Sequence, residues 1–179
     1  MVNRGLELLK KGDVRSICEG AMLLRKVGGQ EAIEALLPHL RSRVEQVRDC
    51  VREALDRMDV APVLMGWWHG ADAEKRRQAL EYAVGLSHPG LLVLYQEAAQ
   101  SRDAVQRKQA AIGLKRQGRS AEVYRLLAAL VADDDRDVRW WAIDSLGVLG
   151  GTEAVRVLRE RQPAEQDPAL KKFIEKALR

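Results

Sequence analysis

The residue types that most often carry thiol or metal chemistry are few in this sequence and widely spaced. The chain of 179 residues has two cysteines, Cys18 and Cys50, and three histidines, at positions 39, 69 and 88. Neither cysteine is part of a Cys-x-x-Cys pair, and no histidine has a second histidine or a carboxylate at metal-ligand spacing in its own predicted helix. We therefore expect two reduced thiols in the core, no metal site and no cofactor.

Sequence signals for nucleophilic or phosphate chemistry are also missing. The chain has no Ser-His-Asp order, no glycine-rich phosphate loop and no EF-hand pattern, and its Gly-Gly pairs end helices instead of following strands. An enzymatic role is therefore not favoured.

A basic stretch is the first candidate for binding. Between residues 102 and 125, two acids, Asp103 and Glu122, stand against seven bases: Arg102, Arg107, Lys108, Lys115, Arg116, Arg119 and Arg125. These bases could steer an acidic protein or a phosphate backbone, but Tyr124 is the only aromatic residue nearby, and the acids at 133–135 would repel a continuous polyanion. We interpret the stretch mainly as a solvated face, with Arg107, Lys108, Lys115, Arg116 and Arg119 as the residues available to an acidic partner.

Two adjacent tryptophans, Trp140 and Trp141, form the second candidate. Neighbouring residues on a helix point about 100° apart, so both rings cannot be buried equally. The helical pattern places Trp141 on the core side with Ser145 and Trp140 on the outer side with Asp144. An exposed tryptophan is typical of a binding hot spot, so we predict a partner contact at Trp140 and Asp144. The alternative is that Trp140 packs across the preceding loop, near residues 133–135.

A second tryptophan pair, Trp67 and Trp68, precedes His69 and Gly70. Trp67 occupies a core position of the pattern, whereas Trp68 is one position further round and is expected to be half exposed and available to a partner. The helix should end near Gly70.

Composition predicts the helical class that must hold these residues. Hydrophobic residues make up 46% of the chain and aromatic residues 4%, and Leu, Ala, Glu and Arg dominate, which favours helices over strands. The net charge of +4 is a mild bias. We found no signal-peptide pattern at Met1 and no apolar run long enough to span a bilayer, so we expect a cytoplasmic protein with no membrane contact.

An internal repeat organises the helices. With Val138 as position zero, the equivalent residues lie at Ser16, Val47, Lys75, Gln106 and Leu170, with spacings of 31, 28, 31, 32 and 32 residues. Eight residues past zero, the core side of the helix carries Leu24, Leu55, Ala83, Leu114 and Leu146. Each repeat therefore predicts a first helix, a turn and a second helix.

Charged residues mark the start of each first helix. An acid lies three residues before zero, at Asp13, Asp72, Asp103, Asp135 and Asp167, with Glu45 displaced by one, and a base lies one residue after zero, at Arg48, Arg76, Arg107, Arg139 and Lys171. The acids suit helix caps, whereas a first-turn arginine needs an acidic partner. We predict that these Asp and Arg side chains pair within or between neighbouring repeats; the alternative is a solvated charged edge.

The second helices are expected to start at Pro62, Pro89, Ser120 and Thr152, residues suited to a cap or a first turn. Residues 3–11 form an orphan second helix, and residues 167–179 form a capping first helix. The prediction is one domain over residues 1–179, with five helix pairs that begin near 13, 44, 72, 103 and 135.

The motifs of the fifth repeat resemble the HEAT-like repeats of the phycobilin-lyase type. They are an acidic start, Val138-Arg139, then Ala-x-x-x-Leu-Gly from Ala142, then Gly-Gly-x-x-Ala-Val-x-x-Leu from Gly150. The resemblance implies an all-α, right-handed α-α superhelix, or solenoid, whose second helices line the concave side.

Enzymes built on similar repeats can be compared residue by residue. Deoxyhypusine hydroxylase carries His-Glu pairs that bind iron, but the three histidines here precede Leu40, Gly70 and Pro89, so that activity is excluded. HEAT-like alkylpurine DNA glycosylases use an exposed Trp with an Asp one turn later, a spacing that Trp140 and Asp144 reproduce. Phycobilin lyases are similar in their repeats, but no residue here marks a bilin site.

The sequence thus predicts a non-enzymatic scaffold that binds another protein through its second-helix groove and the Trp140 region. A monomer is expected. The alternative is a DNA-binding or DNA glycosylase-like protein that uses Trp140, Asp144 and the basic stretch. A further alternative is a phycobilin lyase-like or lyase-chaperone subunit.

Overall fold

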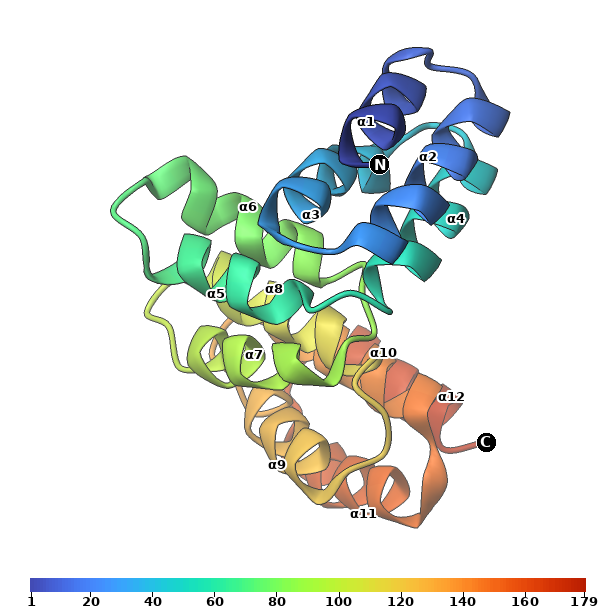
Figure 1. Ribbon diagram of the computed structural model, residues 1–179. Coiled ribbons are helices and arrows are strands. Elements are labelled where there is room, and N and C mark those ends of the chain that lie inside the picture. The colour runs from blue at the N-terminus through green and yellow to red at the C-terminus, as the bar shows by residue number, and fades with distance from the viewer. The chain divides into compact units, whose positions relative to one another are not determined.

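Residues 1–179 of the computed structural model form helices and no strands, as the all-α prediction requires (Figure 1). A single helix, five helix pairs and a final single helix follow one another, with three short 3-10 turns between them. The α-helices are α1 (Val2–Lys10), α2 (Val14–Val27), α3 (Gln30–Leu36), α4 (Glu45–Leu55), α5 (Val60–His69), α6 (Ala73–Ala83), α7 (Leu92–Ala99), α8 (Ala104–Leu114), α9 (Ala121–Leu130), α10 (Arg136–Leu149), α11 (Gly151–Arg161) and α12 (Pro168–Ala177); the 3-10 turns are η1 (Leu37–Arg41), η2 (Pro89–Leu91) and η3 (Gln162–Ala164).

The helices form two compact parts, which we call the N-half (Met1–Gly90) and the C-half (Leu91–Arg179). The boundary falls inside the third helix pair, between α6 and α7. In the N-half, the first helix α2 packs on α1 and α4; in the C-half, α10 packs on α8 and α12. None of the helices is long and apolar enough to cross a membrane.

The core positions of the repeat are buried as their spacing predicts. The five residues eight past position zero are completely buried: Leu24, Leu55, Ala83, Leu114 and Leu146. Close packing also requires glycine at position 113, because a Cβ added there would clash with the ring of the fully buried Tyr95. Each half thus contains a packed apolar core.

Aspartate caps start five of the six first helices. The side chains accept backbone hydrogen bonds of 2.8 to 2.9 Å: Asp13 from Ser16, Asp72 from Glu74, Asp103 from Val105, Asp135 from Asp137 and Asp167 from Ala169. The exception is α4, which begins at Glu45 after Val44 and has no side-chain cap. The acidic residues of the repeat are therefore helix caps, as predicted.

The predicted starts of the second helices are correct to within a turn. Ser120 caps α9 by accepting the Val123 amide at 3.2 Å, and Pro62 lies in the first turn of α5. Thr152 lies inside α11, because Gly150 is the N-cap there. Gly150 and Gly151 have φ angles of 61° and 83°, a conformation that only glycine adopts readily, so this turn requires the Gly-Gly pair.

Two of the predicted arginines, Arg107 and Arg139, pair with acids between repeats, but these acids are not the predicted ones. Arg48 and Arg76 donate instead to the backbone carbonyls of Ser42 and Gly70. Arg107 donates to Asp133 Oδ2 at 2.7 Å, and Arg139 donates to Glu165 Oε2 at 3.0 Å. These acids lie two residues before the caps of the next first helix, because the caps Asp135 and Asp167 are occupied by the amides of their own helices. Of the caps, Asp167 also pairs across repeats, with Arg136.

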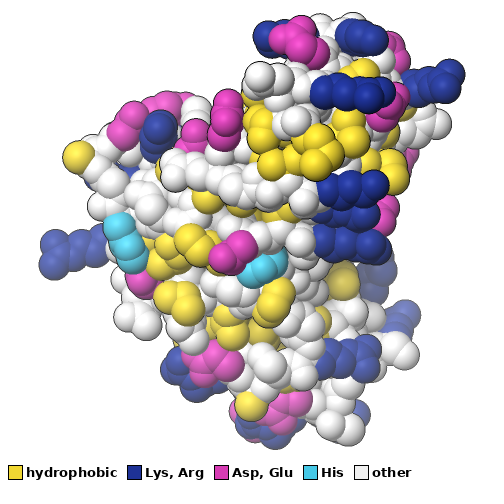
Figure 2. Space-filling view, in the orientation of Figure 1, with side chains coloured by type: hydrophobic (Ala, Val, Ile, Leu, Met, Phe, Trp, Pro, Cys, Tyr) yellow, Lys and Arg dark blue, Asp and Glu magenta, His cyan; other side chains and the backbone are white.

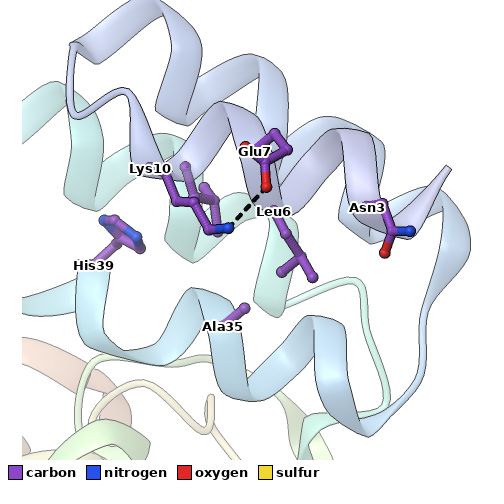
Figure 3. A pocket seen from close by; sticks show the side chains of 7 residues that line it. Asn3, Leu6, Glu7, Lys10, Ala35 and His39 are labelled. Atoms are coloured by element: carbon purple, nitrogen blue, oxygen red, sulfur yellow. Dashed lines mark hydrogen bonds and ion pairs between the residues drawn. The ribbon is translucent and has the colours of Figure 1, made fainter.

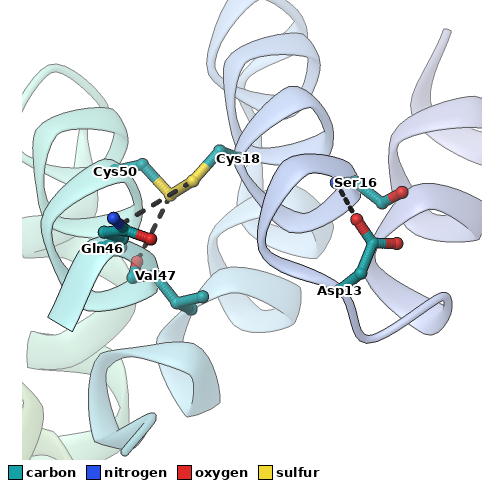
Figure 4. The surroundings of a disulfide bond; sticks show 6 residues. All are labelled: Asp13, Ser16, Cys18, Gln46, Val47 and Cys50. Carbon is teal, nitrogen blue, oxygen red and sulfur yellow. Dashed lines mark hydrogen bonds between the residues drawn. A yellow bond between two sulfur atoms is a disulfide. The ribbon is translucent and has the colours of Figure 1, made fainter. Parts of the chain in front are cut away.

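The prediction of two reduced core thiols is wrong. Cys18 on α2 and Cys50 on α4 form a disulfide with a Cα–Cα distance of 5.5 Å, and both residues are half-buried (Figure 4). The bond is possible because the cysteines occupy nearly equivalent positions on neighbouring first helices. Disulfides are uncommon in the cytosol, so the cytoplasmic location stays a prediction that the bond does not favour.

Candidate functional site

Trp140 is less exposed than predicted, because the terminal helix covers it. The Trp140 ring stacks on Phe173 of α12, with ring centroids 5.1 Å apart and planes inclined by 15°. Its other neighbour is Trp141, in an edge-to-face contact at 4.6 Å. Trp140 is therefore half-buried in an aromatic cluster, and it packs towards α12 and not over the preceding loop at 133–135.

Asp144 does not stand free beside Trp140. Its carboxylate pairs with Lys115 on α8 at 2.9 Å, and the Lys115 ammonium lies 5.5 Å from the centre of the Trp141 ring. Trp141 is half-buried, not a full core residue, whereas Ser145 is completely buried and donates to the Ala111 carbonyl at 2.6 Å. Asp144 and Lys115 thus connect neighbouring first helices.

The basic stretch is partly neutralised by acids of the same half. Arg107 pairs with Asp133, Lys115 with Asp144 and Arg125 with Glu122. Among the other predicted contact residues, Arg116 and Arg119 are exposed and Lys108 is half-buried. The structure therefore leaves fewer cations for a polyanion than the sequence suggested.

The arginines lower the pKa values of two buried or half-buried acids, Asp133 and Glu165. Burial would raise the pKa of Asp133, but hydrogen bonds from Arg107 and from the Asp135 amide hold that pKa below its usual value. Burial likewise opposes the charge of Glu165, which is completely buried, yet the Asp167 amide, Arg161 and Arg139 lower the pKa of Glu165. Both carboxylates are ionised at neutral pH and serve as structural counter-charges.

Helix α5 differs from the other α-helices because it contains no Asp, Glu, Lys or Arg. It ends at His69 with Gly70 as its C-cap, as predicted. Trp67 and Trp68 near its end are both half-buried. Trp68 is therefore as exposed as predicted, whereas Trp67, predicted to be a core residue, is only partly buried. A helix without charges presents an unusual surface in a chain with 31% charged residues.

The ring of Trp67 is held from several sides. Its Nε1 donates to Glu34 Oε1 on α3 at 3.3 Å, and Gln30 donates to the same oxygen at 2.8 Å. The Lys75 ammonium lies 5.4 Å from the ring centre, and Tyr82 makes an edge contact at 6.3 Å. These contacts fix the indole as a rigid wall beside α3.

A groove runs between α3 and α5 in the N-half. It consists of two adjoining hollows of about 310 and 390 Å³ that share Gln30, Pro62 and Val63. One continues past Gly66 and Trp67 to Lys75, and the other continues to Gly29 and Asp59. We call this the α3–α5 groove. Hydrophobic side chains interrupt the charged surface over α3 and over α5 (Figure 2).

A third hollow of the N-half, about 450 Å³, lies between α1 and α3. Leu6 and Ala35 face each other across it, Lys10 bonds to Glu7 at 2.7 Å, and His39 stands at one end (Figure 3). Burial lowers the pKa of His39, so its imidazole is neutral at pH 7. The α3–α5 groove and this hollow therefore both lie on the second-helix side of the N-half.

The sequence pattern predicted a second-helix groove and a contact at Trp68 on α5, but charges and exposed aromatic residues alone did not locate the groove between α3 and α5. The available signals were the ten residues of α5 without a charge and the glycine inside it, Gly66.

Comparison with known proteins agrees with the helix-pair order. Residues 91–179 match the family model for HEAT repeats. Two engineered proteins with crystal structures have TM-scores of 0.50 at 20% and 18% identity, over 99% of this chain and 94% and 96% of theirs. A computationally designed armadillo repeat protein for modular peptide recognition also has a TM-score of 0.50, at 15% identity, over 99% of this chain and 98% of its own.

Such low identities show the fold alone, and no curated protein matches the chain. The matches do not distinguish the phycobilin-lyase type from other repeats of this kind. Residues 91–179 are thus similar to HEAT repeats, and the order of helices over the chain is that of an all-α repeat fold.

Proposed function

We propose that this chain is a non-enzymatic scaffold that binds another protein, and that the α3–α5 groove is its contact surface. The observation that carries the proposal is the groove itself, whose α5 wall has no charged side chain and includes the restrained ring of Trp67. Aromatic side chains in well-packed surroundings are typical centres of binding energy.

The other second helices support this choice by contrast. On α9, Arg125 pairs with Glu122, and on α11, Arg156 pairs with Glu153 and Glu160. Charged pairs of this kind keep an outer helix face solvated. The α5 wall lacks them, and a hollow with one wall free of charged side chains is typical of a place that another molecule covers.

The Trp140 region is a weaker candidate for the same role. The Trp140 ring is already stacked on Phe173, and the Asp144 carboxylate is already paired with Lys115. The same contacts remove the support for a DNA glycosylase-like use of this Trp and Asp. Duplex binding that weakens strongly between two salt concentrations would bring that alternative back.

The relation to the phycobilin-lyase type of repeat is a finer proposal that rests on the motifs of the fifth repeat alone. No residue of the grooves marks a bilin site. A shift in bilin absorbance on mixing with the chain would support that relation to lyases; an unchanged spectrum would count against it.

The scaffold proposal is tested by capturing partners from a lysate with tagged variants. Val63→Glu places a carboxylate in both hollows of the groove, while Val148→Glu is the matched control, because Val148 is 63% exposed on α10, outside the groove. Proteins recovered with wild type and with Val148→Glu should be missing with Val63→Glu. Unchanged recovery with a folded Val63→Glu chain would refute the groove as the contact surface.

A further inference from the structure

We infer that the α3–α5 groove takes an amphipathic α-helix of a partner protein, with an acidic residue that faces Lys75. This inference rests on the proposed function and narrows it to one class of partner. Three features of the groove carry it: few polar groups along its middle, open space at Gly66 and an ammonium group without a carboxylate partner.

The polar groups of the groove favour a helix over an extended peptide. Its middle is lined by Val63, Gly66 and Trp67, whose backbones belong to α5 and are paired within it. The indole N–H and the Gln30 amide both already donate to Glu34. An extended peptide would bury its own amides there without partners, whereas a helix satisfies its backbone internally.

Gly66 provides the space for close approach. It is exposed inside α5, and a Cβ placed on it would meet no atom within 4 Å. Packing within this chain therefore does not require a glycine, and a glycine in a helix interior costs about 1 kcal/mol relative to alanine. Two helices approach more closely where side chains at the contact are small, so the space suits the ridge of a second helix.

Lys75 defines the charge of the partner. It is exposed, lines the end of the groove beyond Trp67, and its ammonium lies over the indole ring. Asp72 lines the same hollow but forms no ion pair with Lys75; its carboxylate accepts the amides of Glu74 and Lys75 as the cap of α6. A carboxylate on the partner helix would therefore gain an ion pair next to a rigid apolar wall.

The test uses displayed peptides of about 15 residues, long enough to cover the ten residues of α5. The library mixes helix-forming frameworks with frameworks interrupted by proline. Selection on the wild-type chain should enrich helical peptides with an apolar stripe at i, i+3 or i+4 and i+7 and an acid at one end. Enrichment of proline-interrupted peptides, or of none, overturns the inference.

Variants then locate the binding by fluorescence anisotropy of an enriched peptide. Gly66→Leu places a side chain in the open space, where its Cβ meets no atom within 4 Å, and should weaken binding by about 10-fold or more, equivalent to about 1.4 kcal/mol. Ala129→Leu adds the same side chain at an exposed position of α9 and should bind like wild type. Lys75→Glu should weaken binding, and a peptide with Lys in place of its acid should restore it. Equal binding by Gly66→Leu and wild type refutes the inference.

Two further outcomes separate this inference from the scaffold proposal. If Val63→Glu loses its lysate partners while the library enriches extended peptides, the scaffold stands and the helical partner is wrong. If the wild-type chain self-associates and Gly66→Leu abolishes that association, a second copy occupies the groove and the inference of a different partner protein is overturned. Circular dichroism of each variant confirms that the fold is retained.

Discussion

Removal of the Cys18–Cys50 disulfide should lower the free energy of unfolding by about 3.7 kcal/mol. The two cysteines are 32 residues apart in sequence. A cross-link over a loop of that length removes about 12 cal/mol/K of entropy from the unfolded chain, which is about 3.7 kcal/mol at 25 °C in the chain-entropy model. That is a large part of the 5 to 15 kcal/mol typical of a folded domain.

Urea unfolding followed by circular dichroism measures this loss. With slopes of about 1 to 3 kcal/mol/M, the midpoint should fall by about 1 to 4 M when the wild-type chain is reduced or when both cysteines are replaced by alanine. The half-buried sulfurs should be accessible to a small dithiol. The double variant is its own control, because reductant should leave its midpoint unchanged.

Amide hydrogen exchange should show that the lost stability is local to the disulfide: the amides of α2 and α4, the helices that it joins, should be less protected in the reduced chain than in the oxidised chain. Thiol titration of the denatured, unreduced chain should find no free thiol. Two free thiols in that titration, or a reduced chain with an unchanged midpoint, would refute the reasoning.

Other perturbations test the packing and the ion pairs between repeats. Glu165→Gln should lower the free energy of unfolding by about 3 kcal/mol, the lower end for a broken buried pair because Arg139 and Arg161 keep some solvent contact. The pKa of Glu165 is lower in the folded chain than in the unfolded chain, so its ionised carboxylate stabilises the fold fully above the unfolded pKa of about 4.3. This stabilisation is lost as the pH falls through the lower folded pKa. The urea midpoint of Glu165→Gln should therefore vary less with pH between about 5 and 2 than that of wild type. Gly66→Ala should stabilise the chain by about 1 kcal/mol, while Gly113→Ala, which meets the Tyr95 ring, should destabilise it by about 1 to 3 kcal/mol; thermal unfolding of the two should shift in opposite directions. Trp140→Ala should cost about 1 kcal/mol or more in urea unfolding through the lost stack on Phe173 but should retain lysate partners, and loss of those partners would favour the sequence-based hot spot instead.

Features that depend on a few neighbouring residues were predictable from the sequence. The aspartate caps need a carboxylate two or three residues before a backbone amide, as at Asp135, so a recurring acid before an apolar helical pattern is sufficient evidence. The Gly150–Gly151 turn is local in the same way. The aspartate cap recurs in most repeats and the Gly-Gly turn in the first and the fifth, which is why the pattern located them.

Contacts between repeats were harder to predict because they depend on the offset between neighbouring helices. The pattern indicated that first-turn arginines need acids, but Arg107 and Arg139 reach Asp133 and Glu165, each 26 residues later. The disulfide has the same character. Its separation of 32 residues is one more than the 31-residue spacing of the two repeats concerned. This near match is a signal that Cys18 and Cys50 lie on adjacent first helices, and spacing rules for metal sites do not detect it.

Both tryptophan regions depart from the repeat pattern, but the residues around each region determine whether it can bind a partner. At Trp140 the next first helix supplies Phe173, so the chain itself covers the ring that looked exposed in one repeat. At α5 the space at Gly66 stays open, because Gly66 contributes no side chain and Glu34 of the neighbouring α3 is held by hydrogen bonds from Gln30 and Trp67. A departure from the repeat therefore indicates a binding surface only where the space beside it stays open, as at Gly66 of α5, and not where the chain itself covers the ring, as at Trp140.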